Sequence, residues 1–61
     1  MKVQTFRSKV SSETLQQMDL HINEWMEENN IQPKFINQSF GYEIHRQSGV
    51  QEPVVVISVW Y

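Results

Sequence analysis

The stretch EPVVVISVWY, residues Glu52 to Tyr61, decides how the rest of the chain is interpreted. Seven of its final eight residues are apolar or aromatic, and Ser58 is the one interruption. A strand with one solvent-exposed face alternates apolar and polar residues, whereas a strand that is buried on both faces is apolar at nearly every position. The stretch therefore predicts a central strand of a sheet, and its second face needs a cover.

Three segments precede this strand. Residues 1–7 are rich in strand-forming side chains and predict a first strand. Residues 13–29 predict a helix, because apolar side chains recur every three or four positions. These side chains are Leu15, Met18, Ile22, Trp25 and Met26. A serine before Glu13 can cap the start of this helix, and Asn29-Asn30 can end it.

Residues 34–46 predict the second strand, in which Ile36, Phe40, Tyr42 and Ile44 share one face. Gly41 in the middle of this strand suggests a bulge or a close backbone approach. Residues 47–53 are rich in turn formers and return the chain as a hairpin. The third strand then runs from residue 54 to residue 61.

The order β-α-β-β predicts a single α+β domain over residues 1–61, with a three-stranded, mainly antiparallel sheet. One amphipathic helix, Leu15 to Met26, packs on one face of it. We expect the last strand between the other two, while a direct right-handed crossover from the first strand to the second is the alternative. The predicted core consists of Val3, Leu15, Met18, Ile22, Met26, Ile36, Phe40, Ile44 and residues of the 54–59 run.

The size and composition limit how such a domain can be stabilised. A domain of 61 residues buries only about 60% of its unfolded surface, and disulfides, a metal or oligomerisation usually supplement it. The chain has no cysteine, which excludes disulfides and thiolate metal sites. No apolar run is long enough to span a membrane, and MKVQTFRSKV at residues 1–10 lacks the apolar centre of a secretory signal, so we expect a cytoplasmic protein without a membrane partner.

A second copy of the chain is the simplest cover for the last strand, so we predict a homodimer or a larger homo-oligomer, with another protein as the alternative. Leu20 lies on the wet side of the predicted helix and is a further contact candidate. The candidate interface residues are Val54, Val55, Val56, Ile57, Val59, Trp60, Tyr61 and Leu20.

No catalytic, metal or cofactor site is predicted. His21, Glu24 and Glu28 share a helix face, but three ligands on one exposed helix do not close a metal site, so we expect a solvated acidic face. His45 with Glu43 is interpreted as an exposed polar pair rather than a catalytic dyad. Nucleic acid is not an expected partner, because the five basic residues are scattered and the net charge is −2.

Four stretches carry a resemblance over the whole length: KVQTF from Lys2, LHINEWMEE from Leu20, KFINQSF from Lys34 and VVVISVWY from Val54. Together they resemble small bacterial β-α-β-β proteins of unassigned function, such as the sporulation-associated group. The resemblance implies this fold and an accessory cytoplasmic role, and no catalytic residue comes with it.

Two better-defined families resemble the chain in length and element order alone. The 4-oxalocrotonate tautomerases use an N-terminal proline as their base, whereas Lys2 holds that position here. Dodecins stack a flavin on a tryptophan of the second strand, whereas the tryptophans here are Trp25 and Trp60. The function expected is thus a non-enzymatic oligomerisation or protein-interaction module. The alternative is a small-ligand (flavin-like) or nucleic-acid binder that uses the open sheet face.

Overall fold

The computed structural model describes residues 1–61 and contains one helix and three strands in the order β-α-β-β. The elements are β1 (Val3–Lys9), α1 (Ser12–Glu28), β2 (Phe35–Ile44) and β3 (Gln51–Trp60). The predicted α+β class is confirmed. No helix combines the length and the apolar character needed to cross a membrane.

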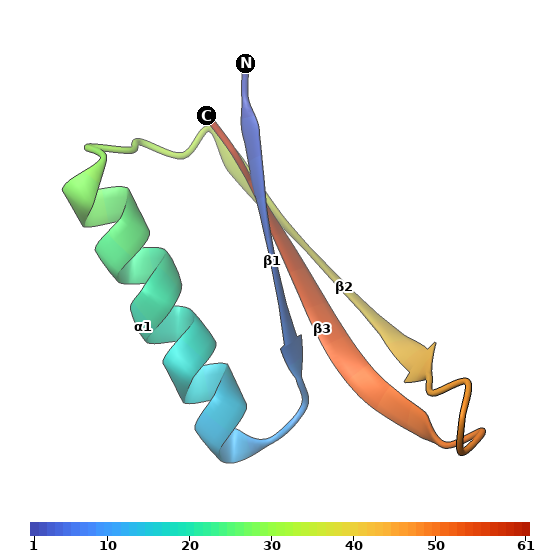
Figure 1. The fold of residues 1–61 in the computed structure, drawn as a ribbon. Coiled ribbons are helices and arrows are strands. Elements are labelled where there is room, and N and C mark those ends of the chain that lie inside the picture. The colour runs from blue at the N-terminus through green and yellow to red at the C-terminus, as the bar shows by residue number, and fades with distance from the viewer.

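The sheet has the strand order β1-β3-β2, and both outer strands run antiparallel to β3 (Figure 1). This is the expected arrangement. The alternative, a direct crossover that places β2 beside β1, is wrong. Phe6 of β1 lies opposite Ile57, and Phe40 of β2 lies opposite Val55. Hydrogen bonds between the backbones of Lys2 and Tyr61 hold the two chain ends side by side.

The hairpin between β2 and β3 is longer than expected, because β3 begins at Gln51 rather than Val54. Since β2 ends at Ile44, the turn spans residues 45–50, and Gly49 adopts φ 68° within it. The prediction for Gly41 was wrong: pairing with β3 continues unbroken through it, and a Cβ there would meet no atom within 4 Å. Neither a bulge nor a close approach explains this glycine.

Both helix ends follow the local sequence. Ser11 is the N-cap, and its Oγ accepts a hydrogen bond of 3.1 Å from the backbone N–H of Thr14. At the other end Asn30 adopts φ 55°, and the N–H of Ile31 donates to the carbonyl of Met26 over 2.8 Å. A left-handed residue followed by this backbone bond is the Schellman form of helix end, for which asparagine is suited.

The core lies between α1 and the face of β1 and β3 that the helix covers. Val59 is fully buried, and the ring of Trp25 packs edge-on against Phe6 with centroids 5.4 Å apart. The buried cluster consists of Phe6, Met18, Ile22, Val55 and Val59, with Leu15, Trp25, Met26 and Ile57 packed around it. Within the core, the predictions for Met18, Ile22 and the β3 residues are confirmed.

Four predicted core residues are exposed instead: Val3, Ile36, Phe40 and Ile44. Val3 lies on the opposite face of β1 from Phe6, so Phe6 takes the core position that was assigned to Val3. The three β2 residues lie on the expected, helix-bearing face of the sheet, but no other element packs over them. A helix is about 10–12 Å wide and strands lie about 4.8 Å apart, so one helix covers about two strands. Here α1 lies alongside β1, and β2 is the strand farthest from it (Figure 1).

Candidate interaction surface

The largest exposed apolar side chains on the sheet form one row along β2, hereafter the β2 row: Ile36, Phe40, Tyr42 and Ile44. Their exposed fractions are 53, 60, 63 and 61%. Alternation along the strand places all four on the side of the sheet that carries α1. The rings of Phe40 and Tyr42 meet edge to face with centroids 5.5 Å apart. The uncovered strand therefore presents one apolar row, which Gln38 interrupts between Ile36 and Phe40, rather than scattered residues.

A hollow of about 290 Å³ continues this strip toward the helix. Ile36 lines it from β2, and Ile57 and Val59 line it from β3. On its far side Ile22 and Met26 of α1 complete a largely apolar lining. The β2 row and this hollow together form one apolar surface that starts under the helix and ends at the free edge of the sheet.

The opposite face of the sheet, which carries no helix, is covered in part by charged side chains. Arg7 of β1 and Glu43 of β2 form an ion pair of 3.7 Å across β3. Arg7 lies opposite Val56 and Glu43 lies opposite Glu52, so a line between them crosses β3 at Val54. Val54 is only 8% exposed although no helix covers it. The second face of β3 thus receives part of its cover from within the chain.

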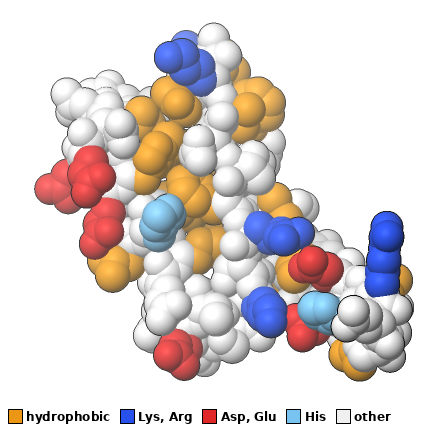
Figure 2. Space-filling view, in the orientation of Figure 1, with side chains coloured by type: hydrophobic (Ala, Val, Ile, Leu, Met, Phe, Trp, Pro, Cys, Tyr) orange, Lys and Arg blue, Asp and Glu red, His pale blue; other side chains and the backbone are white.

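Glu52 is the centre of a second charged group at the same end of the sheet. One oxygen lies 3.3 Å from Lys9 Nζ, and the other lies 3.2 Å from His45 Nε2. Hydrogen bonding from His45, and then from Lys9, holds the pKa of Glu52 below its ordinary value. Figure 2 shows basic, acidic and histidine side chains gathered at the lower right, over this end of the sheet.

At the other end of the helix-free face, Phe35 stacks on Trp60. Their ring centroids are 5.5 Å apart and their planes differ by 17°. Phe35 is 47% exposed, and Trp60 is half-buried. The Nε1 of Trp60 is covered yet has no hydrogen-bond partner in the chain. The exposed ring of Phe35 is therefore the accessible part of this aromatic pair.

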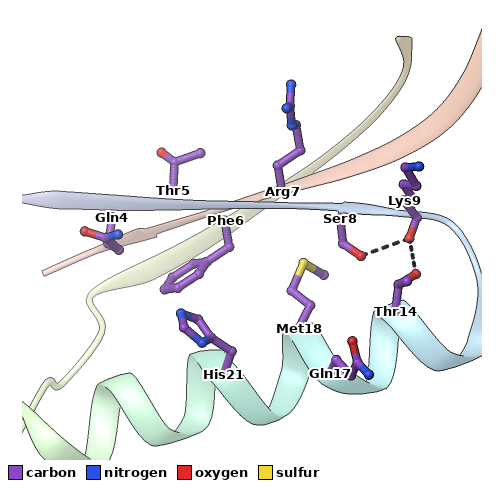
Figure 3. A pocket seen from close by; sticks show the side chains of 10 residues that line it. All are labelled: Gln4, Thr5, Phe6, Arg7, Ser8, Lys9, Thr14, Gln17, Met18 and His21. Carbon is purple, nitrogen blue, oxygen red and sulfur yellow. Dashed lines mark hydrogen bonds between the residues drawn. The ribbon is translucent and has the colours of Figure 1, made fainter.

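A polar hollow of about 550 Å³ lies between β1 and α1 (Figure 3). Gln4, Phe6 and Ser8 point from β1 toward the helix, whereas Arg7 points away from it. The ring of His21 meets Phe6 edge-on with centroids 5.8 Å apart. No acidic side chain lines the hollow, so nothing in it orients His21 as a general base.

The structure separates the candidate interface residues of the sequence analysis into three groups. Val55 and Val59 face the helix in the core, and Val54 is buried on the other face, so these three side chains are not available to a partner. Leu20 is 60% exposed on α1. The remaining candidates, Val56, Ile57, Trp60 and Tyr61, are half-buried.

The two histidines contact residues other than the carboxylates with which the sequence analysis grouped them. His45 contacts Glu52 rather than Glu43, which pairs with Arg7. His21 packs on Phe6, and no three histidine, aspartate or glutamate side chains come together as metal ligands.

Sequence reasoning missed the β2 row as a surface, because the alternation of residues 36–44 is the same for a covered and an uncovered strand. One signal was available. The segment from Phe35 to Ile44 contains neither lysine nor proline, the residues that usually protect an exposed edge strand.

Comparison of the chain with protein families, with curated proteins and with solved structures finds no match.

Proposed function

We propose that this chain is a non-enzymatic protein-interaction module that assembles with itself, and that the β2 row is its contact surface. The single observation that carries the proposal is the exposure of Ile36, Phe40, Tyr42 and Ile44, each more than half exposed on one strand. Burying a large apolar side chain contributes about 1.5–3 kcal/mol. Four such side chains in one strip favour a surface that is covered in the working state.

The size of the core supports the same proposal. Only six of the 61 residues are buried, and a domain with so small a core is marginally stable by itself. Disulfides are not available to this chain. Association is the remaining common supplement, because burial of the β2 row against a partner adds apolar contact without a larger domain.

The proposed setting is the cytoplasm, which suits a small domain that uses no disulfides.

The test is the solution mass, measured by light scattering coupled to size exclusion over a wide range of protein concentration. We expect a dimer or larger assembly for the natural chain and a monomer for Phe40→Asp. Leu20→Asp is the matched control, because both residues are 60% exposed and both variants gain the same charge. A natural chain that stays at 7.3 kDa at all concentrations would contradict the proposal.

A third variant, Val56→Asp, separates the two faces of the sheet. Val56 lies on the helix-free face, where it is half-buried. Dissociation by Val56→Asp alone would keep the self-assembly but move the contact from the β2 row to the other face. Circular dichroism on each variant establishes that it is folded before its mass is interpreted.

The stacked pair of Phe35 and Trp60 favours a second candidate function, the binding of a planar aromatic ligand such as a flavin. The ring of Phe35, 47% exposed, offers a stacking surface. Titration with flavin mononucleotide should quench Trp60 fluorescence in a Trp25→Phe background, and Phe35→Leu should weaken the quenching. Unchanged fluorescence would remove this candidate. Nucleic acid is less favoured, because Arg7 and Lys9 are both engaged by acidic side chains.

A further inference from the structure

The free edge of β2 exposes the backbone groups of the same residues that form the β2 row. The N–H of His45 donates to the carbonyl of Val50, which continues the register of β2 with β3, so His45 directs its backbone groups toward the β3 side of β2. In an antiparallel strand, successive residues point their backbone groups to opposite sides. Because pairing is unbroken along β2, the residues at positions 36, 38, 40, 42 and 44 direct their N–H and C=O groups outward. This edge therefore offers hydrogen bonds and apolar side chains together.

The two edges of the sheet differ in their protection. On β1, α1 packs alongside the strand, whereas Arg7 and Lys9 lie on the helix-free face and reach inward over the sheet to Glu43 and Glu52. Charged residues, lysine above all, and a covering helix are the usual devices that prevent strand addition. On β2 the only charged residue is Glu43, which lies on the other face from the β2 row and is paired with Arg7. Strand addition is therefore open at β2 and opposed at β1.

We infer that β2 of one molecule pairs antiparallel with β2 of a second copy, with Phe40 opposite the Phe40 of that copy. This inference rests on the proposed self-assembly and names its geometry. In this register Ile36 lies opposite Ile44, and Gln38 lies opposite Tyr42. Every outward-pointing residue of β2 is then paired, and its one charged residue, Glu43, lies opposite Asn37; just beyond the strand ends Lys34 lies opposite Arg46. The strand is thus complementary to its own reversed copy, as a two-fold contact requires.

The area available suits a modest interface. An aromatic side chain buries about 150–250 Å², so Phe40 and Tyr42, at 60 and 63% exposure, offer on the order of 250 Å² per copy. The two isoleucines and the strand backbone add to this area. A standard interface buries about 800 Å² per partner, so the edge contact belongs at the small end of this range. We therefore expect a dimer that dissociates on dilution.

The pairing also completes a site that one molecule has only in part. A two-fold axis perpendicular to the sheet keeps both helices on the same face of a continuous six-stranded sheet. The hollow lined by Ile22, Met26, Ile36 and Ile57 then faces its symmetry mate across the paired strands. Two half-grooves become one apolar groove between two helices, floored by both β2 rows.

Single-cysteine variants test the register directly, because the natural chain contains no cysteine. Directly opposite residues in a hydrogen-bonded pair have Cα atoms about 5.5 Å apart, within the disulfide range of about 4.4–6.8 Å. Phe40→Cys should form a disulfide-linked dimer under mild oxidation. Gln38→Cys and Tyr42→Cys should crosslink with each other in a mixture but not with themselves, since each lies about 13 Å from its own copy.

Leu20→Cys is the control for random collision, because Leu20 is as exposed as Phe40. Crosslinking of Tyr42→Cys or Gln38→Cys with itself at the rate of the mixture would overturn the antiparallel register. A dimeric mass for the natural chain without selective crosslinking at any of the three β2 positions would overturn the edge contact and leave the proposed function intact. A monomeric mass at every concentration would overturn both.

Discussion

Arg7 and Glu43 lie on the two outer strands and join over the central one, in an ion pair of 3.7 Å that passes above Val54. The two side chains are 63 and 41% exposed, so their Coulomb attraction is screened by water and contributes little. The hydrocarbon stem of an arginine can still cover apolar surface. Together with Lys9, which lies opposite Val54 on β1 and pairs with Glu52, this ion pair accounts for the 8% exposure of Val54 on a face that carries no helix.

The role of the Arg7 stem predicts different results for two substitutions at this position. Arg7→Ala removes both charge and stem and should lower the free energy of unfolding by about 1 kcal/mol. Arg7→Met keeps most of the stem and should lower it by less than about half that amount. Urea unfolding at one fixed protein concentration measures both, with Arg46→Ala as a control outside any ion pair. Equal losses for Arg7→Ala and Arg7→Met would assign the effect to charge.

The same substitution in the core and in the β2 row should have unequal effects on the monomer. Ile22 is 7% exposed in the core between α1 and the sheet, whereas Ile44 is 61% exposed at the end of β2. Ile22→Val should cost about 0.5–1.5 kcal/mol, because it leaves a gap in packed surroundings. Ile44→Val should change the free energy of unfolding by less than about 0.5 kcal/mol at a concentration where the chain is monomeric. A large loss for Ile44→Val in the monomer would show that β2 is covered within the chain.

The two glycines should respond oppositely to threonine. At Gly41 the backbone lies in a regular strand and a new Cβ meets no atom within 4 Å, so Gly41→Thr should stabilise the fold by about 0.5–1 kcal/mol. Gly49 has φ 68°, where a β-branched side chain is strained, so Gly49→Thr should destabilise it by about 1–2 kcal/mol. Thermal unfolding of both variants gives the comparison. Destabilisation by Gly41→Thr would point to a neighbour that approaches this position in the assembled state.

Glu52 should make stability depend on pH in the acid range. Its pKa is lower in the folded chain than the ordinary value of 4.5, so the unfolded chain takes up a proton first as the pH falls. The stabilisation is therefore present above about pH 4.5 and is lost as the pH drops through the lower folded-state pKa. Unfolding free energies at neutral pH and below pH 4.5 should differ less in Glu52→Gln than in the natural chain. Glu24→Gln, outside any ion pair, should leave the difference unchanged.

The sequence predicted the order and pairing of the elements because its signals are local or follow from composition. The apolar spacing from Leu15 to Met26 predicted the helix, and the lack of alternation after Pro53 predicted a central strand. Burial of individual residues was predicted less well. Phe6 and Val3 lie on opposite faces of β1, and each is a plausible core residue. The register with β3 decides between them, and no local pattern encodes that register.

The candidate surface could not be located from the sequence for a related reason. Phe40 has the same parity whether or not a helix lies above it, and the sequence pattern does not record where α1 crosses the sheet. The reasoning about β3 identified a strand with two apolar faces correctly. It did not anticipate that Arg7 and Glu43 would cover Val54 from the neighbouring strands.

The central place of β3 also determines the order in which the sheet can form. The pairing of β2 with β3 needs only the closure of a short turn, and such hairpins form in about 1–10 μs. The pairing of Val3 with Trp60 must instead close nearly the whole chain, which costs more entropy because that cost grows with loop length. We therefore expect the docking of β1 to be the slow step of folding, and the core shared by α1, β1 and β3 to be completed when β1 docks.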